Sequence, residues 1–184
     1  MEIKITSQQV LNVLLVISWI IFIGLCITAG GIIVNAVLTL ILDPIIAKNL
    51  WKQADLSSLF AYDKVYFIVI TLLMSIVAVM EALLFYLIVK ILHDKKINFK
   101  NPFNTEMSKF ISSASYLTLG IGFFAIMGVK NVDMLVSKGV TMPDIESLRL
   151  GGSDVWLFMG ITLLVIAQIF KRGVEIQSEN ELTI

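Results

Sequence analysis

The stretch Ile5–Leu42, ITSQQVLNVLLVISWIIFIGLCITAGGIIVNAVLTLIL, contains 38 residues without one acidic or basic side chain. Three further apolar blocks follow it: Val65–Val89, interrupted only by Glu81, then Phe110–Val129 and Val155–Phe170. A helix needs ~20 mostly apolar residues to cross the ~30 Å hydrocarbon core of a bilayer. Because lipid cannot satisfy backbone hydrogen bonds, such blocks can only be helices. The sequence therefore predicts an all-α membrane protein, a bundle of four transmembrane helices.

The composition supports this fold class. Of the 184 residues 58% are hydrophobic, whereas a soluble domain has ~45–50% apolar residues. We expect one domain over residues 1–184, with spans near 10–31, 65–89, 110–129 and 155–170. Fourteen basic and fourteen acidic residues cancel, so no overall charge indicates direct nucleic acid binding. With one cysteine and one histidine, we expect no internal disulfide, no metal site and no cofactor.

The distribution of Lys and Arg beside the spans predicts the orientation in the membrane. Eight of the fourteen basic residues precede the first span, lie in the 90–109 loop or begin the 171–184 tail. The other six lie in the two remaining loops. Since basic segments close to the spans stay in the cytoplasm, we expect both termini, the 90–109 loop and the tail on that side.

The first block is longer than a membrane is thick. Residues 10–42 would form a helix of ~50 Å. The adjacent Gly30 and Gly31 offer a place to bend, because glycine weakens a helix. We therefore expect the span to end near these glycines, and Ile32–Leu42 to project outward or lie along the outer surface.

The loops on the outer side predict a small extracytoplasmic cap of short helices. Asp43 is a suitable N-cap for Pro44–Ala54, which we expect to form an amphipathic helix at the membrane interface. The 130–153 loop adds a helical stretch near 132–137. Other helix starts are expected at Asp63, at Asn104 or Thr105, and at Ser153 or Asp154.

Glu81 is the one acidic or basic side chain inside an apolar block. A carboxylate at this depth costs a few kcal/mol, so it should face the bundle and find a partner on another span. If the helices are antiparallel, the polar residues at the depth of Glu81 are Ser18, Tyr116 and Thr118, with Gln168 at a shallower level. These residues are the candidate partners. We favour a protonated Glu81 whose hydrogen bonds tie helices together. The alternative is a carboxylate that binds a proton or a cation.

Enzymatic motifs are absent from the sequence. It has no G-x-S-x-G, no glycine-rich phosphate loop and no H-E-x-x-H, and the acidic residues of the outer loops show no spacing that favours a metal. Ala114, Thr118 and Gly122 recur at helical spacing, which is typical of close helix packing. We therefore expect that the protein is not an enzyme.

The most distinctive polar sequence lies on the predicted cytoplasmic side. We expect the loop before the third span and the tail after Phe170 to form one surface, in which apolar anchors and glutamates bind a basic partner. The alternative is that the tail packs on its own loop and closes this end of the bundle. The candidate residues are Asn101, Pro102, Phe103, Arg172, Gly173, Glu175, Gln177, Glu179, Asn180, Glu181, Leu182 and Thr183.

The same two segments resemble a bacterial family of small four-span membrane proteins that is known only as a domain of unknown function. In that family a phrase like F-[KR]-R-G-x-E-[LI]-Q-x-E-N-[DE]-L-T-[VI] closes the chain, as FKRGVEIQSENELTI does here. Its loop pattern N/E-P-F-x-x-E-N resembles the segment that begins at Asn101, although Met107 stands where a polar residue is usual. The resemblance implies a multi-pass protein of the bacterial inner membrane. It also implies a partner, because such genes often neighbour a small helix-turn-helix regulator.

Two functions are compatible with these patterns. The favoured one is a regulatory or interaction protein that senses a signal at the lipid bilayer and engages a cytoplasmic partner such as that regulator. The alternative is a small transporter or channel with Glu81 as its proton or cation site. Homo-oligomerisation remains open, and no pattern identifies the signal.

Overall fold

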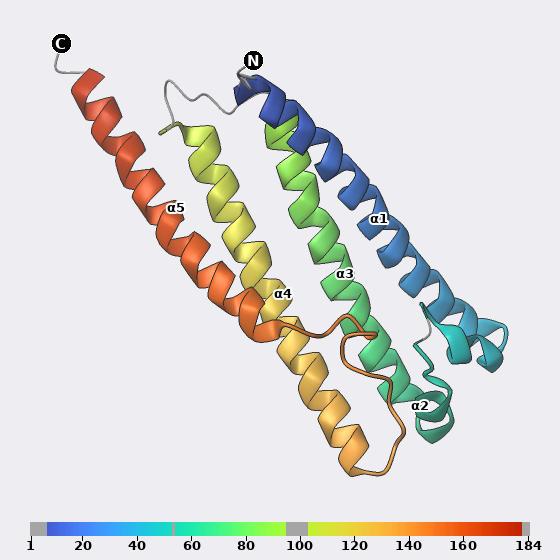
Figure 1. Ribbon diagram of the computed structural model, residues 1–184. Coiled ribbons are helices and arrows are strands. Elements are labelled where there is room, and N and C mark those ends of the chain that lie inside the picture. Colours follow the sequence, from blue (N-terminus) through green and yellow to red (C-terminus); the bar gives the residue numbers. More distant parts are fainter. Residues whose placement is uncertain (1–6, 53, 95–102, 182–184) are drawn as a thin grey trace, which may run out of the picture.

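The computed structural model describes residues 7–52, 54–94 and 103–181, which are mostly helical and contain no strand. Four long helices dominate the described residues (Figure 1): α1 (Ser7–Ile41), α3 (Lys64–His93), α4 (Thr105–Ser137) and α5 (Ser153–Glu181). Two short helices, η1 (Pro44–Asn49) and α2 (Ser57–Tyr62), lie between α1 and α3. All four long helices are apolar enough and long enough to cross a membrane. The predicted four-helix membrane fold is confirmed.

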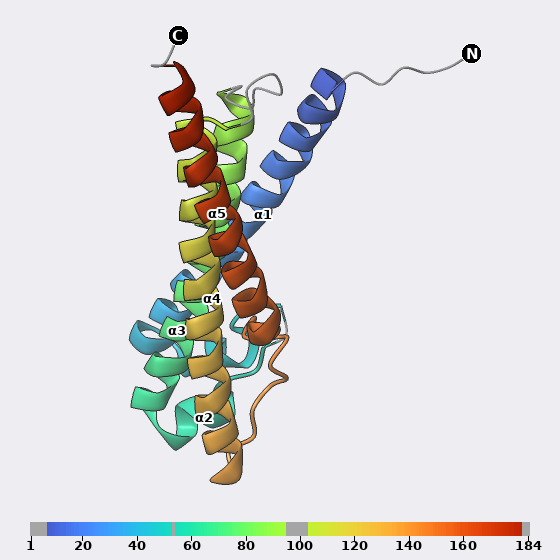
Figure 2. The ribbon, with the colours of Figure 1, turned by 90° about the vertical axis from the view of Figure 1, so that its left-hand side faces the viewer.

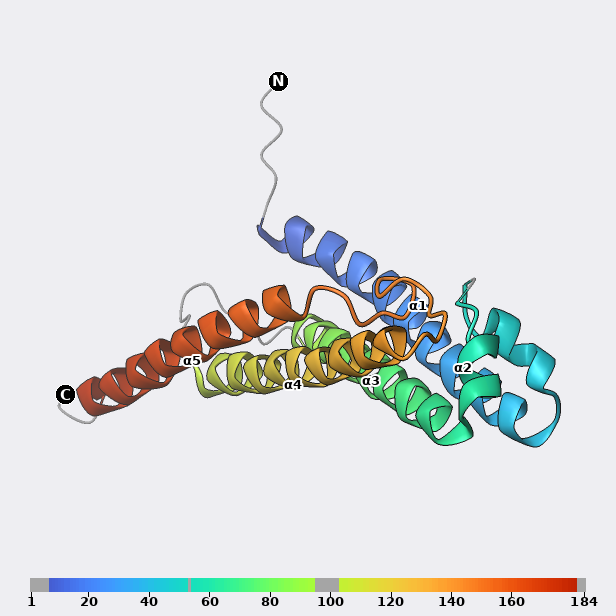
Figure 3. The ribbon, with the colours of Figure 1, turned by 90° about the horizontal axis from the view of Figure 1, so that it is seen from below.

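The long helices form an open row rather than a compact bundle. Contacts join α1 to α3, α3 to α4 and α4 to α5, and within the described ranges none joins α1 to α4 or α5. Toward its N-terminus α1 also diverges from the other helices (Figures 2 and 3). Most apolar side chains of α1 therefore face outward, which suits a helix surrounded by lipid.

The two ends of the row differ. The start of α1, the end of α3, the start of α4 and the end of α5 lie together at one end, which we name the terminal end (Figure 1). The short helices η1 and α2 and the 138–152 loop lie at the opposite end, which we name the distal end. Most of the buried core lies in the distal half, where the η1–α2 segment and the 138–152 loop cover the row.

The helix α1 runs unbroken through Gly30 and Gly31, so the bend expected at these glycines is absent. The reason is packing. The indole ring of Trp51 lies directly against Gly31, in space that a Cβ would occupy. Beyond this contact Ile32 and Ala36 are buried in the core, whereas Ile41 and Leu42 at the end of the segment are exposed. Gly31 thus makes room for an aromatic ring and is not a point of bending.

The segment after Asp43 packs one side on the protein, but the helix expected over Pro44–Ala54 is shorter than the sequence predicts. Asp43 is the N-cap, as expected, and its carboxylate accepts a hydrogen bond from the N–H of Ile45 at 2.8 Å. The helix that follows is only the short 3-10 helix η1. Leu50 is fully buried after it, and its carbonyl accepts a hydrogen bond from the Asn35 side chain on α1 at 2.6 Å. These contacts fasten η1 to α1.

The remaining helix ends follow ordinary capping chemistry. Asp63 accepts from the N–H of Val65 at 2.6 Å, and Asn104 accepts from the N–H of Met107 at 2.8 Å, as the sequence predicts. The helical stretch expected at 132–137 is the last part of α4 itself and not a separate helix of the loop.

A further carboxylate closes the turn before α2. Asp55 is hydrogen-bonded by the side chain and the backbone N–H of Ser57, and these bonds hold the pKa of the Asp55 carboxyl below its ordinary value.

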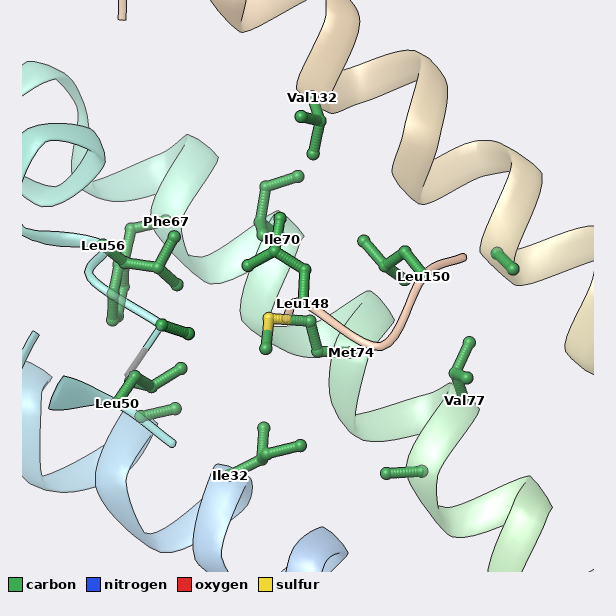
Figure 4. Close-up of a cluster of buried hydrophobic side chains, with 14 of the residues drawn as sticks. Ile32, Leu50, Leu56, Phe67, Ile70, Met74, Val77, Val132, Leu148 and Leu150 are labelled. Atoms are coloured by element: carbon green, nitrogen blue, oxygen red, sulfur yellow. The ribbon is translucent and has the colours of Figure 1, made fainter. Parts of the chain in front are cut away.

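Figure 4 shows the core that joins the distal loops to the helices. Phe67, Ile70 and Met74 of α3 form its centre and are fully buried. Around them lie buried side chains from α1, from the η1–α2 segment, from α4 and from the 138–152 loop: Ile32, Leu50, Leu56, Val132, Leu148 and Leu150. The distal segments therefore share one core, which is centred on α3.

The adjacent glycines of α1 provide a matched test of this packing. We expect Gly31→Ala to destabilise the fold by about 1–3 kcal/mol, because the new methyl group overpacks the site of Trp51. Gly30→Ala should be neutral or stabilise by up to about 1 kcal/mol, since its Cβ meets no atom within 4 Å and alanine favours a helix. Thermal unfolding in lipid–detergent micelles measures both. Equal effects of the two substitutions would contradict the contact, whereas a Trp51→Ala background should remove the penalty at Gly31.

Candidate functional site

The site begins with Glu81, which lies in the middle of α3 and is 8% exposed. The Arg149 guanidinium donates a hydrogen bond to the Glu81 carboxylate and forms an ion pair with it. Arg149 belongs to the 138–152 loop and to none of the helices. The buried carboxylate is thus matched by a cation that reaches it from a loop.

The loop reaches this depth because its apolar residues enter the core. Leu148 and Leu150, on either side of Arg149, are fully buried. Leu150 packs against Gly128 of α4, where an added Cβ would lie 2.7 Å from the leucine methyl groups. The N–H of Leu150 donates a hydrogen bond to the carbonyl of Ile145 at 3.1 Å, which closes a turn over residues 145–150. Two leucine anchors therefore hold Arg149 between them.

The backbone at Arg149 is unusual. Its φ of 58° is in the left-handed region, which costs a residue with a side chain of order 1–3 kcal/mol. Gly152, with φ of 68°, turns the chain into α5 without this penalty. The buried leucines and the ion pair compensate for the strain at Arg149, since they fix the conformation that aims the guanidinium at α3.

The folded-back path of the 138–152 loop also determines where α5 begins. Gly122 of α4 packs against Leu157 of α5, and Gly160 packs against Leu119. This register places Ser153, the first residue of α5, about 16 Å short of the distal end of α4. The folded-back loop fills the remaining length. The close packing expected at Gly122 is thereby observed.

A cleft opens beside the ion pair. It has a volume of about 310 Å³ and is lined by Glu81, Glu146, Arg149, Gly151 and Gly152. Two carboxylates and one guanidinium give it a mixed charge. The described part of the chain contains no group of three or more His, Cys, Asp or Glu residues that could hold a metal ion.

The hydroxyl and amide partners expected for Glu81 are wrong, because Arg149 takes their place. Ser18 and Thr118 are buried, but the Thr118 hydroxyl donates to the carbonyl of Ala114 on its own helix at 2.6 Å. Tyr116 is 64% exposed and Gln168 is exposed.

Equal depth within the apolar blocks cannot indicate Arg149, because this residue lies in a loop outside the blocks. One signal points to Arg149. In LRLGG, at positions 148–152, an arginine stands between two leucines and before two glycines, a pattern of an anchored turn.

At the terminal end the structure brings together two of the segments that the sequence singles out. The ring of Phe103 lies 5.2 Å from the ring of Phe170 and also covers Gly173 of α5. An apolar groove of about 570 Å³ continues from this contact. Its lining residues are Phe103, Ile169, Arg172, Gly173, Ile176 and Gln177.

The other tail candidates extend the same helix. Glu175 accepts a hydrogen bond from Arg172 at 3.0 Å, and Glu179 lies one turn further along α5. For Asn180 and Glu181 the structure describes only the helical backbone. Asn101, Pro102, Leu182 and Thr183 lie outside the described residues.

Comparison with known proteins gives one match. The model of a protein family described as "Protein of unknown function (DUF2975)" matches residues 50–184. Neither the curated proteins nor the solved structures contain a match to the chain.

A double-mutant cycle tests the ion pair. We expect Arg149→Met to destabilise the fold by about 3 kcal/mol, because it leaves the Glu81 carboxylate buried without a cation. Glu81→Leu should also destabilise, while the double variant Glu81→Leu/Arg149→Met should cost less than either single change. Arg172→Met, which breaks the exposed pair with Glu175, should cost under about 1 kcal/mol. Unfolding in mixed micelles measures all four variants, and strictly additive effects at Glu81 and Arg149 would show that the pair contributes nothing.

Proposed function

The chain belongs to the DUF2975 family of proteins of unknown function, and we propose that it is a membrane-embedded regulatory protein that engages a cytoplasmic partner at its terminal end. The observation that carries this proposal is the length of α5. The helix does not stop with its apolar block at Phe170 but continues to Glu181. In the register set by α4, its last turns extend about 10 Å past the start of α4 (Figure 1). This projecting segment has no contact with another helix of the described residues beyond the start of α4, so it offers a surface for another protein.

The surface of this projecting segment suits a basic partner with apolar side chains. The groove beside Phe103 exposes apolar surface, and Ile176 at its edge is 46% exposed. Glu175 and Glu179 lie on the same segment. The C-terminal end of a helix also carries a partial negative charge, which favours cations nearby.

A small helix-turn-helix regulator has the complementary chemistry. Such a protein must present basic residues in order to bind the phosphates of DNA. If those residues meet the glutamates of α5, binding at the membrane competes with binding to DNA. We therefore propose that the protein holds such a regulator at the membrane and releases it in response to a signal.

We further propose that the protein lies in a bacterial inner membrane with both termini in the cytoplasm. The Glu81–Arg149 pair supports this orientation, because Arg149 is engaged inside the row of helices. Without it, the two outer loops retain five basic residues, compared with eight on the terminal side. The bias that keeps basic segments in the cytoplasm is thereby stronger than the raw count indicates. The η1–α2 segment and the 138–152 loop would then form the extracytoplasmic cap.

Transport is the second candidate function, and the cleft beside Glu81 is the observation in its favour. A carboxylate that carries a proton or a cation must release its partner during each cycle. Here the partner is an arginine, which remains protonated in proteins, on a loop that two buried leucines hold in place. This geometry suits an ion pair that holds the loop on α3 better than it suits a transport site.

Photocrosslinking tests the partner proposal. A photoreactive residue in place of Ile176, in the full chain in native membranes, should capture a small basic helix-turn-helix protein. The matched control is Val165 on the same helix, 56% exposed within the apolar block, which should give no such product. Phe103→Ala should lower the yield at Ile176, because it removes the wall of the groove. Crosslinks confined to the chain itself would contradict the proposal.

A flux measurement separates the two candidate functions. In proteoliposomes we expect no proton or cation flux that depends on Glu81, so wild type and Glu81→Gln should behave alike. An ion flux that disappears in Glu81→Gln while the helical content is retained would establish transport instead. Arg149→Lys, which keeps the cation but loses the planar guanidinium, is the companion variant.

A further inference from the structure

A second groove lies between α4 and α5 at the terminal end, beside α5 but separate from the apolar groove of Phe103. Its volume is about 470 Å³. Four hydroxyl side chains and two lysines line it: Thr105, Ser108, Ser112, Ser113, Lys109 and Lys171. The carboxylate of Glu175 also borders it, but that group is paired with Arg172 at 3.0 Å. The groove therefore combines two lysines with several hydroxyl donors.

The depth of the two lysines is fixed by the apolar blocks. Lys109 directly precedes the block 110–129, and Lys171 directly follows the block 155–170. The ends of such blocks mark the boundary between hydrocarbon and headgroups. Since α4 and α5 are antiparallel neighbours, we expect both ammonium groups at the level of lipid phosphates.

These lysines differ from two lysines of the distal end. Lys64 lies over the ring of Phe60 at 5.5 Å, and Lys138 lies over the ring of Tyr66 at 5.1 Å. By contrast, Lys109 and Lys171 form no ion pair with any carboxylate in the described ranges. The terminal pair is therefore available to an external anion.

We propose that this groove binds the headgroup of an anionic phospholipid. The phosphate oxygens accept hydrogen bonds from the two ammonium groups and from the hydroxyls, which are donors of the kind that phosphates take in proteins. One turn deeper on the same face of α4 stands Tyr116, at helical spacing from Ser112 and Ser113 and 64% exposed. Its ring provides a surface for the acyl chain, which gives a use to a residue that does not contact Glu81. Basic pockets between membrane helices bind anionic headgroups in this way.

Lipid titration of the purified full chain in neutral detergent tests the site. Native mass spectrometry compares phosphatidylglycerol with phosphatidylcholine of the same acyl chains. We expect a clear preference for phosphatidylglycerol. Lys109→Gln and Lys171→Gln should each lower its affinity about fivefold, and the double variant roughly 25-fold, from ~1 kcal/mol for each lysine near anionic lipid.

Matched controls separate a built site from general attraction. Lys130→Gln removes a lysine at the other end of the same α4 apolar block and should leave the preference unchanged. Ser108→Ala/Ser112→Ala keeps every charge but should still lower the affinity for phosphatidylglycerol several-fold, because it removes hydrogen-bond donors from the groove. The serine pair also decides the question if the double lysine variant fails to fold.

Four outcomes would overturn the proposal: equal retention of both lipids, an unchanged preference in the double lysine variant, a loss in Lys130→Gln as large as in Lys109→Gln, or no effect of the serine pair. A competition experiment identifies the source of the phosphate. Inorganic phosphate alone should not displace bound phosphatidylglycerol, because the free ion lacks the acyl chain that lies along α4. Complete displacement would assign the groove to free phosphate.

Discussion

The structure depends on the cost of placing a carboxylate in the middle of an apolar helix. Glu81 has only apolar neighbours on its own helix, and an unmatched charge there would cost several kcal/mol. The hydroxyls at similar depth bond their own helices, as Thr118 does. The charge is instead matched by Arg149, and the loop that carries it must fold back into the row of helices. One buried charge thus dictates the path of the whole 138–152 loop.

That path has consequences at the other end of the molecule. The loop occupies the space beside the distal end of α4. For this reason α5 begins about 16 Å short of that end. The glycine–leucine contacts at Gly122 and Gly160 then prevent it from sliding back along α4. A helix of 29 residues in this register must extend beyond the start of α4 at the terminal end. The projecting segment is therefore a geometric result of how Glu81 is neutralised.

The local features of the chain could be predicted from its sequence because they depend on neighbouring residues. Apolar blocks define the four helices, and the caps at Asp43, Asp63 and Asn104 follow from side-chain chemistry within a few positions. The errors concern contacts between distant segments. The sequence predicts a bend at Gly31, whereas the ring of Trp51, twenty positions away, packs against this glycine in an unbroken helix. Likewise, Arg149 is 68 positions from Glu81, so no periodicity along the chain connects them.

The two surfaces at the terminal end share one helix. Residues 169, 172, 173 and 176 of α5 line the apolar groove, whereas residues 171, 174 and 175 line the hydroxyl-rich groove. Since successive residues of a helix turn by about 100°, these sets face different directions. A partner in the apolar groove and a lipid headgroup in the hydroxyl-rich groove would therefore occupy opposite sides of the same turns, with Glu175 within reach of both. Arg172 and Glu175 pair across the boundary, so a charge that engages either group also changes the field at the other groove.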